Sequence, residues 1–265
     1  MIVRNPGRAA ESKYELIVIG GGVQGVTIAL EAALRGLKVL LLEKRDFGNA
    51  TSTNSLRIVH GGLRYLQSMN LSRCRESARE QAWLVSRFPE QFQPLSCIMP
   101  LYGRGLRRPS VFRWALAVNS LLCGHGESHI GQGRILGISE TRTRVPLLQS
   151  PELLGSAQRF DAVMLNPQRL FMEMLRWACS AGATALNYVD VSGLSEGIGA
   201  AWELNTTDRL TGQSCSYHGA HVVVAAGPWS DSLEQHLGLA PTTSFHPSLA
   251  FNVLLNRKPV APGAL

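Results

Sequence analysis

One stretch, residues 14–46 (YELIVIGGGVQGVTIALEAALRGLKVLLLEKRD), constrains the fold more than any other part of this 265-residue chain. The apolar run 16–19 is typical of a strand buried on both faces. Residues 23–35 predict a helix, and the second apolar run, 37–42, predicts another buried strand that ends in Glu43. Between the first strand and the helix stand three glycines at the spacing G-x-G-x-x-G: Gly20, Gly22 and Gly25. The stretch therefore predicts the first β–α–β unit of a Rossmann-like α/β fold.

Each part of this unit suits a dinucleotide. The glycines permit a tight turn, let backbone N–H groups approach a pyrophosphate, and let the helix pack closely on the strand. The N-terminus of the helix carries a partial positive charge that holds an anion. Glu43 can accept hydrogen bonds from ribose hydroxyls and would repel a 2′-phosphate. The glycine spacing alone is weak evidence, but its place in this unit favours a dinucleotide site over a βαβ turn without a ligand.

The charge and composition narrow the class of partner. The formal net charge of +7 comes mostly from arginine, since the chain has only four lysines. These arginines are scattered, so we expect no nucleic-acid partner and favour anionic substrates or an anionic membrane face. No run of about 18 apolar residues occurs, so no transmembrane segment is expected. Residues 110–123 predict a helix packed on the protein rather than an interfacial membrane helix.

The cysteines and histidines bear on the compartment and on metals. Five cysteines form an odd set without a C-x-x-C motif, which indicates free thiols in a reducing compartment. The first 13 residues lack the apolar core of a signal peptide, so a cytoplasmic location is expected. His125 and His129 have a spacing found in metal sites, but no third ligand accompanies them, and no metal is predicted.

A second informative stretch follows the first. Residues 50–55 (ATSTNS) gather hydroxyl and amide side chains suited to hydrogen bonds with phosphate or ribityl oxygens. His60, Gly61 and Gly62 then allow the backbone to approach a flat ring, and Arg64 follows at once. An NAD-type fold has no use for this segment. FAD is longer, and its pyrophosphate and isoalloxazine need a second run of polypeptide.

These two stretches together carry a family resemblance. The pairing of YELIVIGGGVQG with TSTNSLRIVHGGLRYL resembles the FAD-dependent glycerol-3-phosphate dehydrogenases, which belong to the D-amino-acid-oxidase-like flavoproteins. A third match is VVVAAGPW at residues 222–229, where the family has a strand ending in a G-P-W turn. The resemblance implies FAD as the cofactor. It also implies hydride transfer from a secondary alcohol carbon of an anionic substrate to flavin N5, with a membrane quinone as acceptor and peripheral contact on the inner face of the cell membrane.

The resemblance also assigns roles to single residues. On the cofactor side it implies that the ADP half is held by the three glycines and Glu43, and that Val191 pairs with adenine through its backbone. It places Gly227 close to the cofactor. The remaining cofactor-binding positions line the pyrophosphate and ribityl region or lie by the ring: Thr51, Ser52, Ser55, Gly61, Gly62 and Leu63.

Two residues are candidates on the substrate side. Arg64 stands at the family's phosphate-gripping position, and a guanidinium fork suits a phosphate dianion; a structural ion pair is the alternative. His60 is a candidate to polarise or deprotonate the substrate, and a positioned structural histidine is equally compatible with the sequence. The sequence does not identify the catalytic base.

The domain organisation follows from the order of predicted elements. A discontinuous FAD-binding domain is expected over residues 14–95 and 166–240. An incomplete α+β substrate domain is expected over residues 96–165 and 241–265, in which residues 244–256 predict a strand. Members of the resembled family are roughly twice as long, so the chain is expected to be a truncated N-terminal portion that is inactive alone.

Three functions remain open on the sequence. The first is a flavin-dependent dehydrogenase of a phosphorylated or anionic alcohol. The second is a related flavin oxidase or dehydrogenase of an amine or hydroxy acid. The third is a fragment without catalytic activity that binds FAD. Departures from the family pattern on the substrate side, LNPQ at residues 165–168 and SLAFN at 248–252, leave the substrate less defined than the cofactor.

Overall fold

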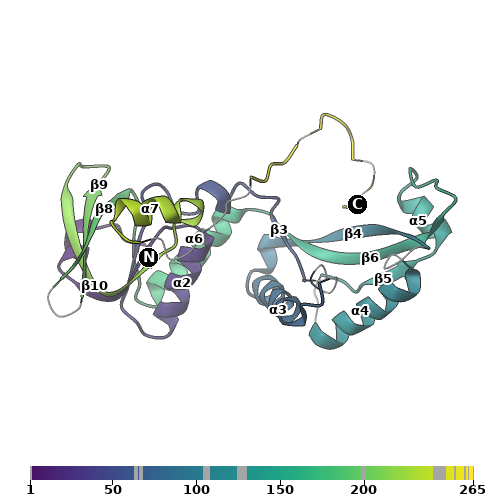
Figure 1. The fold of residues 1–265 in the computed structure, drawn as a ribbon, viewed down its shortest axis with the longest axis horizontal. Coiled ribbons are helices and arrows are strands. Elements are labelled where there is room, and N and C mark those ends of the chain that lie inside the picture. Colours follow the sequence, from purple (N-terminus) through teal and green to yellow (C-terminus); the bar gives the residue numbers. More distant parts are fainter. Residues whose placement is uncertain are drawn as a thin grey trace. The chain divides into compact units, whose positions relative to one another are not determined.

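The chain forms two compact units, each built from two segments (Figure 1). Unit 1 comprises Met1–Ser55 and Asn166–Phe251, and unit 2 comprises Leu56–Leu165 and Asn252–Leu265. The structure is a computed structural model. It describes residues 2–62, 65, 68–103, 108–123, 130–197, 201–240, 249–253, 255–259, 261 and 263–264, and within 108–123 it describes no side chain at 115 or 118–123.

Unit 1 is built on a six-stranded sheet with the order β7-β2-β1-β10-β9-β8. β1, β2, β7 and the second half of β10 run parallel, whereas β10, β9 and β8 form antiparallel pairs. In chain order the strands are β1 (Lys13–Ile19), β2 (Val39–Leu42), β7 (Thr184–Leu186), β8 (Val189–Glu196), β9 (Trp202–Asp208) and β10 (Ser214–Val224).

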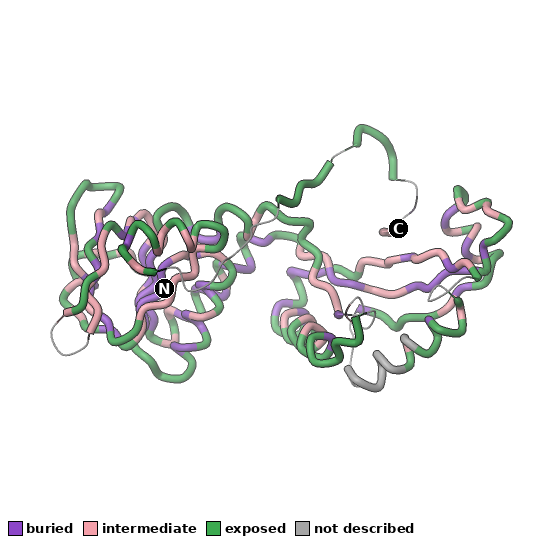
Figure 2. Tube along the Cα trace, viewed as in Figure 1, coloured by how far each residue is buried: buried purple, intermediate pink, exposed green. Residues whose placement is uncertain are grey.

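The parallel part of the sheet is covered on both faces, as its near-continuous apolar strands require. α2 (Val23–Leu34) packs against α6 (Pro167–Ser180) over one face, and Figure 1 shows the two helices side by side. On the opposite face, alternate strand residues such as Ile17 and Leu40 join a buried cluster with Tyr217. Figure 2 shows the buried residues of unit 1 concentrated in these strands.

The remaining helices of unit 1 are short. α1 (Pro6–Ala10) packs on β10. The single turn η1 (Ala50–Ser52) comes after β2, and the single turn η5 (Gly227–Trp229) comes after β10. α7 (Ser230–His236) extends η5. In the sequence, Asn166 followed by Pro167 predicts the start of a helix. α6 confirms it, because the side chain of Asn166 caps the helix and Pro167 occupies its first turn.

Unit 2 is built on an antiparallel sheet in which β6 is central, with the order β3-β6-β4 and β5 also paired to β6. The strands are β3 (Ile58–Val59), β4 (Phe92–Tyr102), β5 (Arg134–Leu136) and β6 (Leu153–Met164). α3 (Leu71–Arg87) and α4 (Pro109–Cys123) lie on the same side of this sheet in Figure 1, and η3 (Pro89–Gln91) joins α3 to β4. α5 (Ile138–Arg144) leads into a cluster of Val145 with Ile98 of β4.

The predicted fold class, a Rossmann-like α/β domain that is discontinuous in sequence, is confirmed. The boundary between the units differs from the prediction, because unit 2 begins at Leu56 and includes residues 56–95. The reason is strand pairing: β3 and β4 both pair with β6, and α3 connects them.

The sequence patterns predict one strand over residues 184–191, and a hairpin arm at 215–218 followed by a separate buried strand at 220–226. Both predictions are wrong in detail. Residues 184–191 form two strands rather than one, since Tyr188 adopts a left-handed conformation (φ 55°) that breaks the run. The predicted hairpin arm 215–218 and buried strand 220–226 are instead one strand, β10. Its first half pairs with β9 and its second half with β1.

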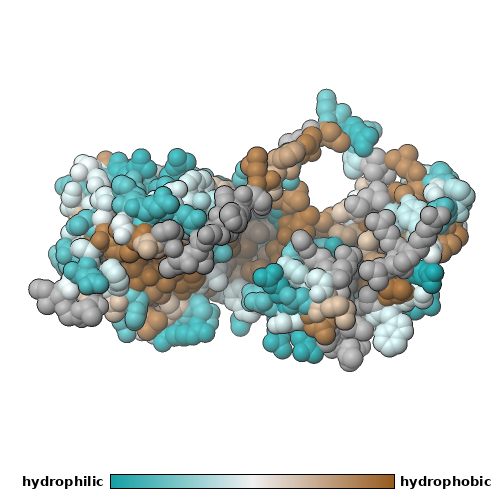
Figure 3. Space-filling view, viewed as in Figure 1, coloured by the Kyte–Doolittle hydropathy of each residue, from teal (hydrophilic) through white to brown (hydrophobic). Residues whose placement is uncertain are grey.

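The predicted strand over residues 244–256 is absent from its described part, residues 249–253 and 255–256. Leu249, Phe251 and Val253 are exposed there and no neighbouring strand pairs with them. Figure 3 shows apolar residues in this stretch, which is the yellow trace of Figure 1. Among the helices in the described part of the chain, none is both long and apolar enough to cross a membrane.

Candidate cofactor site and neighbouring turn

The candidate cofactor site of unit 1 lies at the end of β1, where the order of the strands in the sheet reverses. From β1 the chain passes through α2 to β2 on one side, whereas β10 lies on the other side of β1. The carboxyl ends of β1 and β10 lie together, and Ala225 N–H donates to Ile19 O at 2.7 Å. In open α/β sheets, ligands bind in the crevice at this switch point. The glycine turn after β1 stands there.

Two of the glycines are required by close contacts within the turn. A Cβ atom on Gly20 would overlap the carbonyl oxygen of Ala225, and the residue has φ 115°, which side chains disfavour. A Cβ atom on Gly25 would overlap the carbonyl oxygen of Gly20. The first turn of α2 therefore lies directly on the end of β1. This is the close helix–strand approach that the sequence predicted for Gly25.

The N-terminus of α2 is shaped for an anion. Gly22 is the N-cap residue and offers no side-chain cap, and the first turn holds no acidic residue. The hydroxyl oxygen of Ser52 accepts a hydrogen bond from Val23 N–H at 2.9 Å, so residues 50–55 do reach the start of the helix. Helix N–H groups, the helix dipole and a hydroxyl converge on one point, and these are the groups that bind a pyrophosphate.

Glu43 is positioned by the backbone around it. Its Oε2 accepts from Gly21 N–H at 2.7 Å and its Oε1 accepts from Arg45 N–H at 2.8 Å. The carboxylate therefore connects the glycine turn to the end of β2. Each carboxylate oxygen has a further lone pair for a ribose hydroxyl. The predicted ribose contact fits this position and stays a prediction.

The predicted adenine contact lies near Glu43 in the fold. Val189 N–H donates to Glu43 O at 2.9 Å, so the start of β8 runs beside the end of β2. Val191 is buried two residues further along and pairs with Thr206 of β9. Gly227 follows β10 as the first residue of η5, is exposed, and has φ 58°. Val191 therefore lies on a strand that begins beside Glu43, and Gly227 begins the turn after β10. The cofactor contacts of both residues stay predictions.

The other predicted turn, His60-Gly61-Gly62, belongs to unit 2 and follows β3. Ser77 of α3 contacts His60 twice: its Oγ lies 3.0 Å from Nδ1 and 2.9 Å from the His60 carbonyl oxygen. A hydroxyl has one proton, so both contacts are satisfied when Ser77 donates to the carbonyl and Nδ1–H donates to Ser77. That tautomer leaves Nε2 as an acceptor. The ring of Tyr65 meets the imidazole edge-on, with centroids 5.8 Å apart.

Asp161 supports this turn and was not predicted. It is 2% exposed near the C-terminal end of β6, where its carboxylate accepts from Gly61 N–H at 3.2 Å and from Arg159 Nη1 at 2.7 Å. The Cys97 thiol lies 3.7 Å from its Oδ2, and burial, followed by the Asp161 charge, raises the pKa of this thiol. The sequence did carry a signal for this residue: an aspartate stands within RFDAVM, a run that otherwise predicts a strand. The buried ion pair with Arg159 explains why a charged residue is tolerated there.

Several predicted residues are not placed by the structure. Leu63 and Arg64 lie outside the described residues, as do His125 and His129. Thr51 and Ser55 are exposed on either side of Ser52. Within the described part of the chain, no three metal-ligating side chains gather as a metal site would require.

Comparison with protein families agrees with this geometry. The family described as FAD dependent oxidoreductase matches residues 15–263. The chain is 35% identical over 234 residues to a glycerol-3-phosphate dehydrogenase of Synechocystis, which covers 87% of this chain and 42% of the relative. It is 32% identical over 222 residues to the aerobic glycerol-3-phosphate dehydrogenase of Bacillus subtilis, which covers 84% of this chain and 40% of the relative.

Solved structures give the same picture. The glycerol-3-phosphate dehydrogenase of Bacillus halodurans, solved in complex with FAD, superposes with a TM-score of 0.63 at 27% identity, over 87% of this chain and 38% of that one. Glycine oxidase of Geobacillus kaustophilus superposes with a TM-score of 0.60 at 22% identity, over 86% of this chain and 59% of that one, which shows a shared fold. These matches confirm the predicted resemblance and FAD as the cofactor of the family. The chain spans less than half the length of the three glycerol-3-phosphate dehydrogenases compared above.

Proposed function

The chain belongs to the FAD dependent oxidoreductase family, and from this premise we propose that it is the FAD-binding portion of a glycerol-3-phosphate dehydrogenase-like enzyme. The reaction proposed is oxidation of a secondary alcohol in a small anionic substrate. The observation that carries the proposal is the glycine turn at the switch point of unit 1, with Glu43 bonded across it.

The residues present fit FAD. The first turn of α2 has no acidic residue and its N-cap residue, Gly22, has no side chain, so an anion meets the helix dipole there without a competing charge. Ser52 adds a hydroxyl at the same point, and Glu43 offers a carboxylate at the end of β2. Glu43 also disfavours a 2′-phosphate, which argues against NADP. When bound, FAD supplies the hydride acceptor.

His60 is proposed as the group that takes the proton of the substrate hydroxyl. Its Nδ1 is engaged by Ser77, and the tautomer that satisfies both Ser77 contacts leaves Nε2 unprotonated. An acceptor nitrogen fixed by a second group is the arrangement that general bases use. Asp161 accepts a hydrogen bond from the adjacent Gly61 amide. It therefore positions the turn and does not set which His60 nitrogen carries the proton.

Arg64 is proposed as the residue that binds the anionic group of the substrate. The support is its place in the HGGLRYL motif, directly after the turn that Asp161 and Ser77 hold. A guanidinium fork forms two parallel hydrogen bonds with a phosphate, which an ammonium cannot do.

Electron transfer to a quinone, with peripheral contact of the protein with the membrane, is proposed as the second half of the reaction. The support is the similarity to the dehydrogenases above, together with a net charge of +7 that suits an anionic lipid surface. Reduction of a soluble quinone analogue by substrate, with and without anionic vesicles, tests both parts.

Substrate class is tested by an anaerobic panel in which bleaching of the flavin absorbance reports reduction. It requires a form of the protein that extends to the length of its relatives. We expect bleaching with glycerol 3-phosphate and none with glycine or lactate. Bleaching by an amine or hydroxy acid alone would identify the other function that the sequence left open.

Arg64→Ala in the same form is expected to lower kcat/KM for glycerol 3-phosphate by about 30- to 4,000-fold, the equivalent of about 2–5 kcal/mol for a truncated charge pair. Any activity on neutral glycerol is expected to change little. Arg64→Lys is the matched variant and should restore part of the activity. Equal losses on charged and neutral substrates would show that Arg64 has a structural role.

A further inference from the structure

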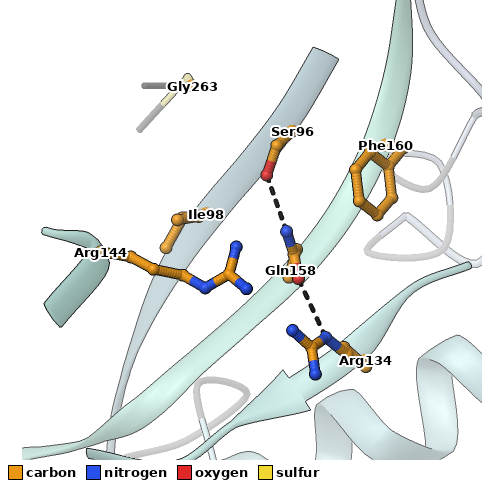
Figure 4. A pocket seen from close by; sticks show the side chains of 7 residues that line it. All are labelled: Ser96, Ile98, Arg134, Arg144, Gln158, Phe160 and Gly263. Carbon is orange, nitrogen blue, oxygen red and sulfur yellow. Dashed lines mark hydrogen bonds between the residues drawn. The ribbon is translucent and has the colours of Figure 1, made fainter. Parts of the chain in front are cut away.

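A pocket of about 390 Å³ opens on the sheet of unit 2, away from the contacts that support His60 and Gly61 (Figure 4). Its lining comes from three neighbouring strands, the end of α5 and Gly263. The residues that matter here are Ser96 and Ile98 of β4, Arg134 of β5, Gln158 and Phe160 of β6, and Arg144 of α5.

A chain of hydrogen bonds fixes one side of the pocket. Arg134 Nε donates to Gln158 Oε1 at 3.1 Å, and Gln158 Nε2 donates to Ser96 Oγ at 2.9 Å. Gln158 is 4% exposed, so its amide is held by the sheet and in turn holds the guanidinium of Arg134. The Ser96 hydroxyl accepts from Gln158 and therefore keeps its own proton to donate.

The two arginines share one counter-ion. Glu140 Oε1 accepts from Arg134 Nη2 at 2.8 Å, from Arg144 Nη2 at 3.1 Å and from Arg144 Nε at 3.3 Å. Within the described part of the chain, Nη1 of each guanidinium has no hydrogen-bond partner. Figure 4 shows both guanidinium groups pointing toward Gln158. Two positive charges with one carboxylate leave an excess of one positive charge.

These ion pairs are poorly suited to a purely structural role. The side chains of Arg134, Arg144 and Glu140 are 54%, 36% and 41% exposed. Ion pairs with this exposure contribute little to stability, because water screens them. The same exposure makes the two unused Nη1 groups accessible to a dissolved anion.

Two apolar side chains, Ile98 and Phe160, also line the pocket and lie on either side of the Ser96–Gln158 hydrogen bond (Figure 4). A Cβ atom on Gly131 would stand 2.8 Å from the ring of Phe160, so Gly131 packs against this ring. The volume lies in the range of small-molecule sites, about 300–1,000 Å³. We propose that this pocket binds a small organic oxyanion, a carboxylate or a phosphate ester, with its oxygens on Arg134 and Arg144 and its short carbon chain against Ile98 and Phe160.

The test is a titration of the 265-residue chain labelled with ¹⁵N-arginine, observed through the arginine Nε–H signals by NMR. The probes are propyl phosphate, butyrate, inorganic phosphate and 1-butanol. Saturable shifts of the Arg134 and Arg144 signals are expected with propyl phosphate or butyrate, and the tighter binder of the two identifies the anion class. Inorganic phosphate is expected to bind several-fold more weakly, and 1-butanol should cause no shift.

Variants separate a site from a general attraction to positive charge. Arg134→Ala and Arg144→Ala are each expected to weaken binding by about tenfold or more, since each removes a charge-assisted hydrogen bond. Glu140→Gln should strengthen binding by about threefold, because it removes a competing charge and keeps the acceptor oxygen. Arg176→Ala is the matched control: it makes the same charge change on α6 of unit 1, where Arg176 pairs with Glu173, and should leave binding unchanged.

Three results would overturn the proposal: no saturable shift with either organic anion, equal weakening in Arg176→Ala, or weaker binding in Glu140→Gln. Circular dichroism checks that each variant is folded. If Arg134→Ala does not fold, Arg144→Ala decides the matter, because the hydrogen bonds described for the Arg144 side chain go only to Glu140. The proposal concerns unit 2 alone and does not depend on FAD.

Discussion

The two glycine-containing turns of this protein are held in different ways. In unit 1, the turn after β1 is fixed by its own backbone: Gly25 packs on the Gly20 carbonyl, and the nearby Glu43 completes it. In unit 2, the turn after β3 is fixed by side chains from distant elements, Ser77 of α3 and Asp161 of β6. The first turn therefore depends mainly on residues of one β–α–β stretch, with one distant contact between Gly20 and the Ala225 carbonyl. The second turn depends on residues that only folding brings together.

Among the substitutions that test this difference between the two turns, Asp161→Ala is expected to lower the stability of the protein most. It leaves the Gly61 amide without its acceptor and Arg159 without its partner, in a site where the aspartate is almost fully buried. Because Arg159 is 31% exposed and can reach water, we expect a loss of about 2–4 kcal/mol in the free energy of unfolding. Urea unfolding followed by circular dichroism measures it.

Asp161→Asn is the matched variant for that change. Its amide oxygen can still accept from Gly61 N–H, so the loss should be smaller than in Asp161→Ala. If the alanine variant proved as stable as the parent chain, the turn of unit 2 would not depend on this side chain, and the contrast between the two turns would fail.

Gly25→Ala tests the turn of unit 1. The added methyl group would overlap the Gly20 carbonyl oxygen, so the start of α2 must shift away from β1. We expect a loss of about 1–3 kcal/mol in stability, with loss of FAD binding because the helix N–H groups move. Thermal unfolding and fluorescence quenching of added FAD measure the two effects.

Gly7→Ala is the control for this substitution, since the Cβ atom there would lie 3.8 Å from its nearest neighbour, Asn5 Oδ1. In a helix, alanine is favoured over glycine by roughly 0.5–1 kcal/mol, so this variant should be no less stable than the parent. Equal behaviour of the two variants would show that close packing at Gly25 is unimportant.

Glu43→Ala is expected to weaken FAD binding by about 5- to 150-fold, the equivalent of about 1–3 kcal/mol for a lost charge-assisted hydrogen bond. Part of this loss comes from the turn itself, because Gly21 N–H loses its acceptor. Glu15→Ala provides the comparison: its carboxylate accepts from Lys38 N–H at the opposite end of β1. If Glu15→Ala weakened FAD binding as much as Glu43→Ala does, Glu43 would have no specific role in binding the cofactor.

The smallest effect concerns pH and lies outside both turns. The hydrogen bond from Arg4 lowers the pKa of Asp208 below its usual value. A lowered carboxyl pKa stabilises the fold above the usual aspartate pKa of about 3.9, and this stabilisation is lost as the pH falls through the folded-state pKa. Because Arg4 is 25% exposed, its removal in Arg4→Ala should cost under about 1 kcal/mol at neutral pH, and less in acid.

Urea unfolding of Arg4→Ala and the parent chain at neutral and acidic pH measures this dependence. Arg8→Ala, the same substitution on α1, serves as the control and should show no such dependence. A gap between Arg4→Ala and the parent that stayed constant down to low pH would mean that Asp208 does not titrate as described.

The sequence was sufficient to predict the parts of the fold whose causes are local. The first β–α–β unit depends on glycine spacing and apolar runs within one stretch, so β1, α2, β2 and the position of Glu43 could all be predicted. The start of α6 was equally clear, because Asn166 and Pro167 specify a helix N-terminus by themselves.

The errors arose where distant pairing decides the structure. β10 is one strand because one half pairs with β9 and the other with β1, and no local pattern encodes that. Unit 2 starts at Leu56 because β3 pairs with β6, about a hundred residues later in the chain. Asp161 was missed for the same reason, since its partner Gly61 is 100 residues away in sequence.

Binding of FAD at the glycine turn of unit 1 can be measured by identifying the cofactor that the protein retains. The purified chain is incubated with an equimolar mixture of FAD, FMN, NAD and NADP, freed of unbound ligand, and denatured; the released cofactor is then identified by chromatography. We expect FAD alone from the parent chain and a marked loss of it from Gly25→Ala. Recovery of NAD, NADP or FMN in its place, or equal FAD from both chains, would contradict FAD binding at this turn.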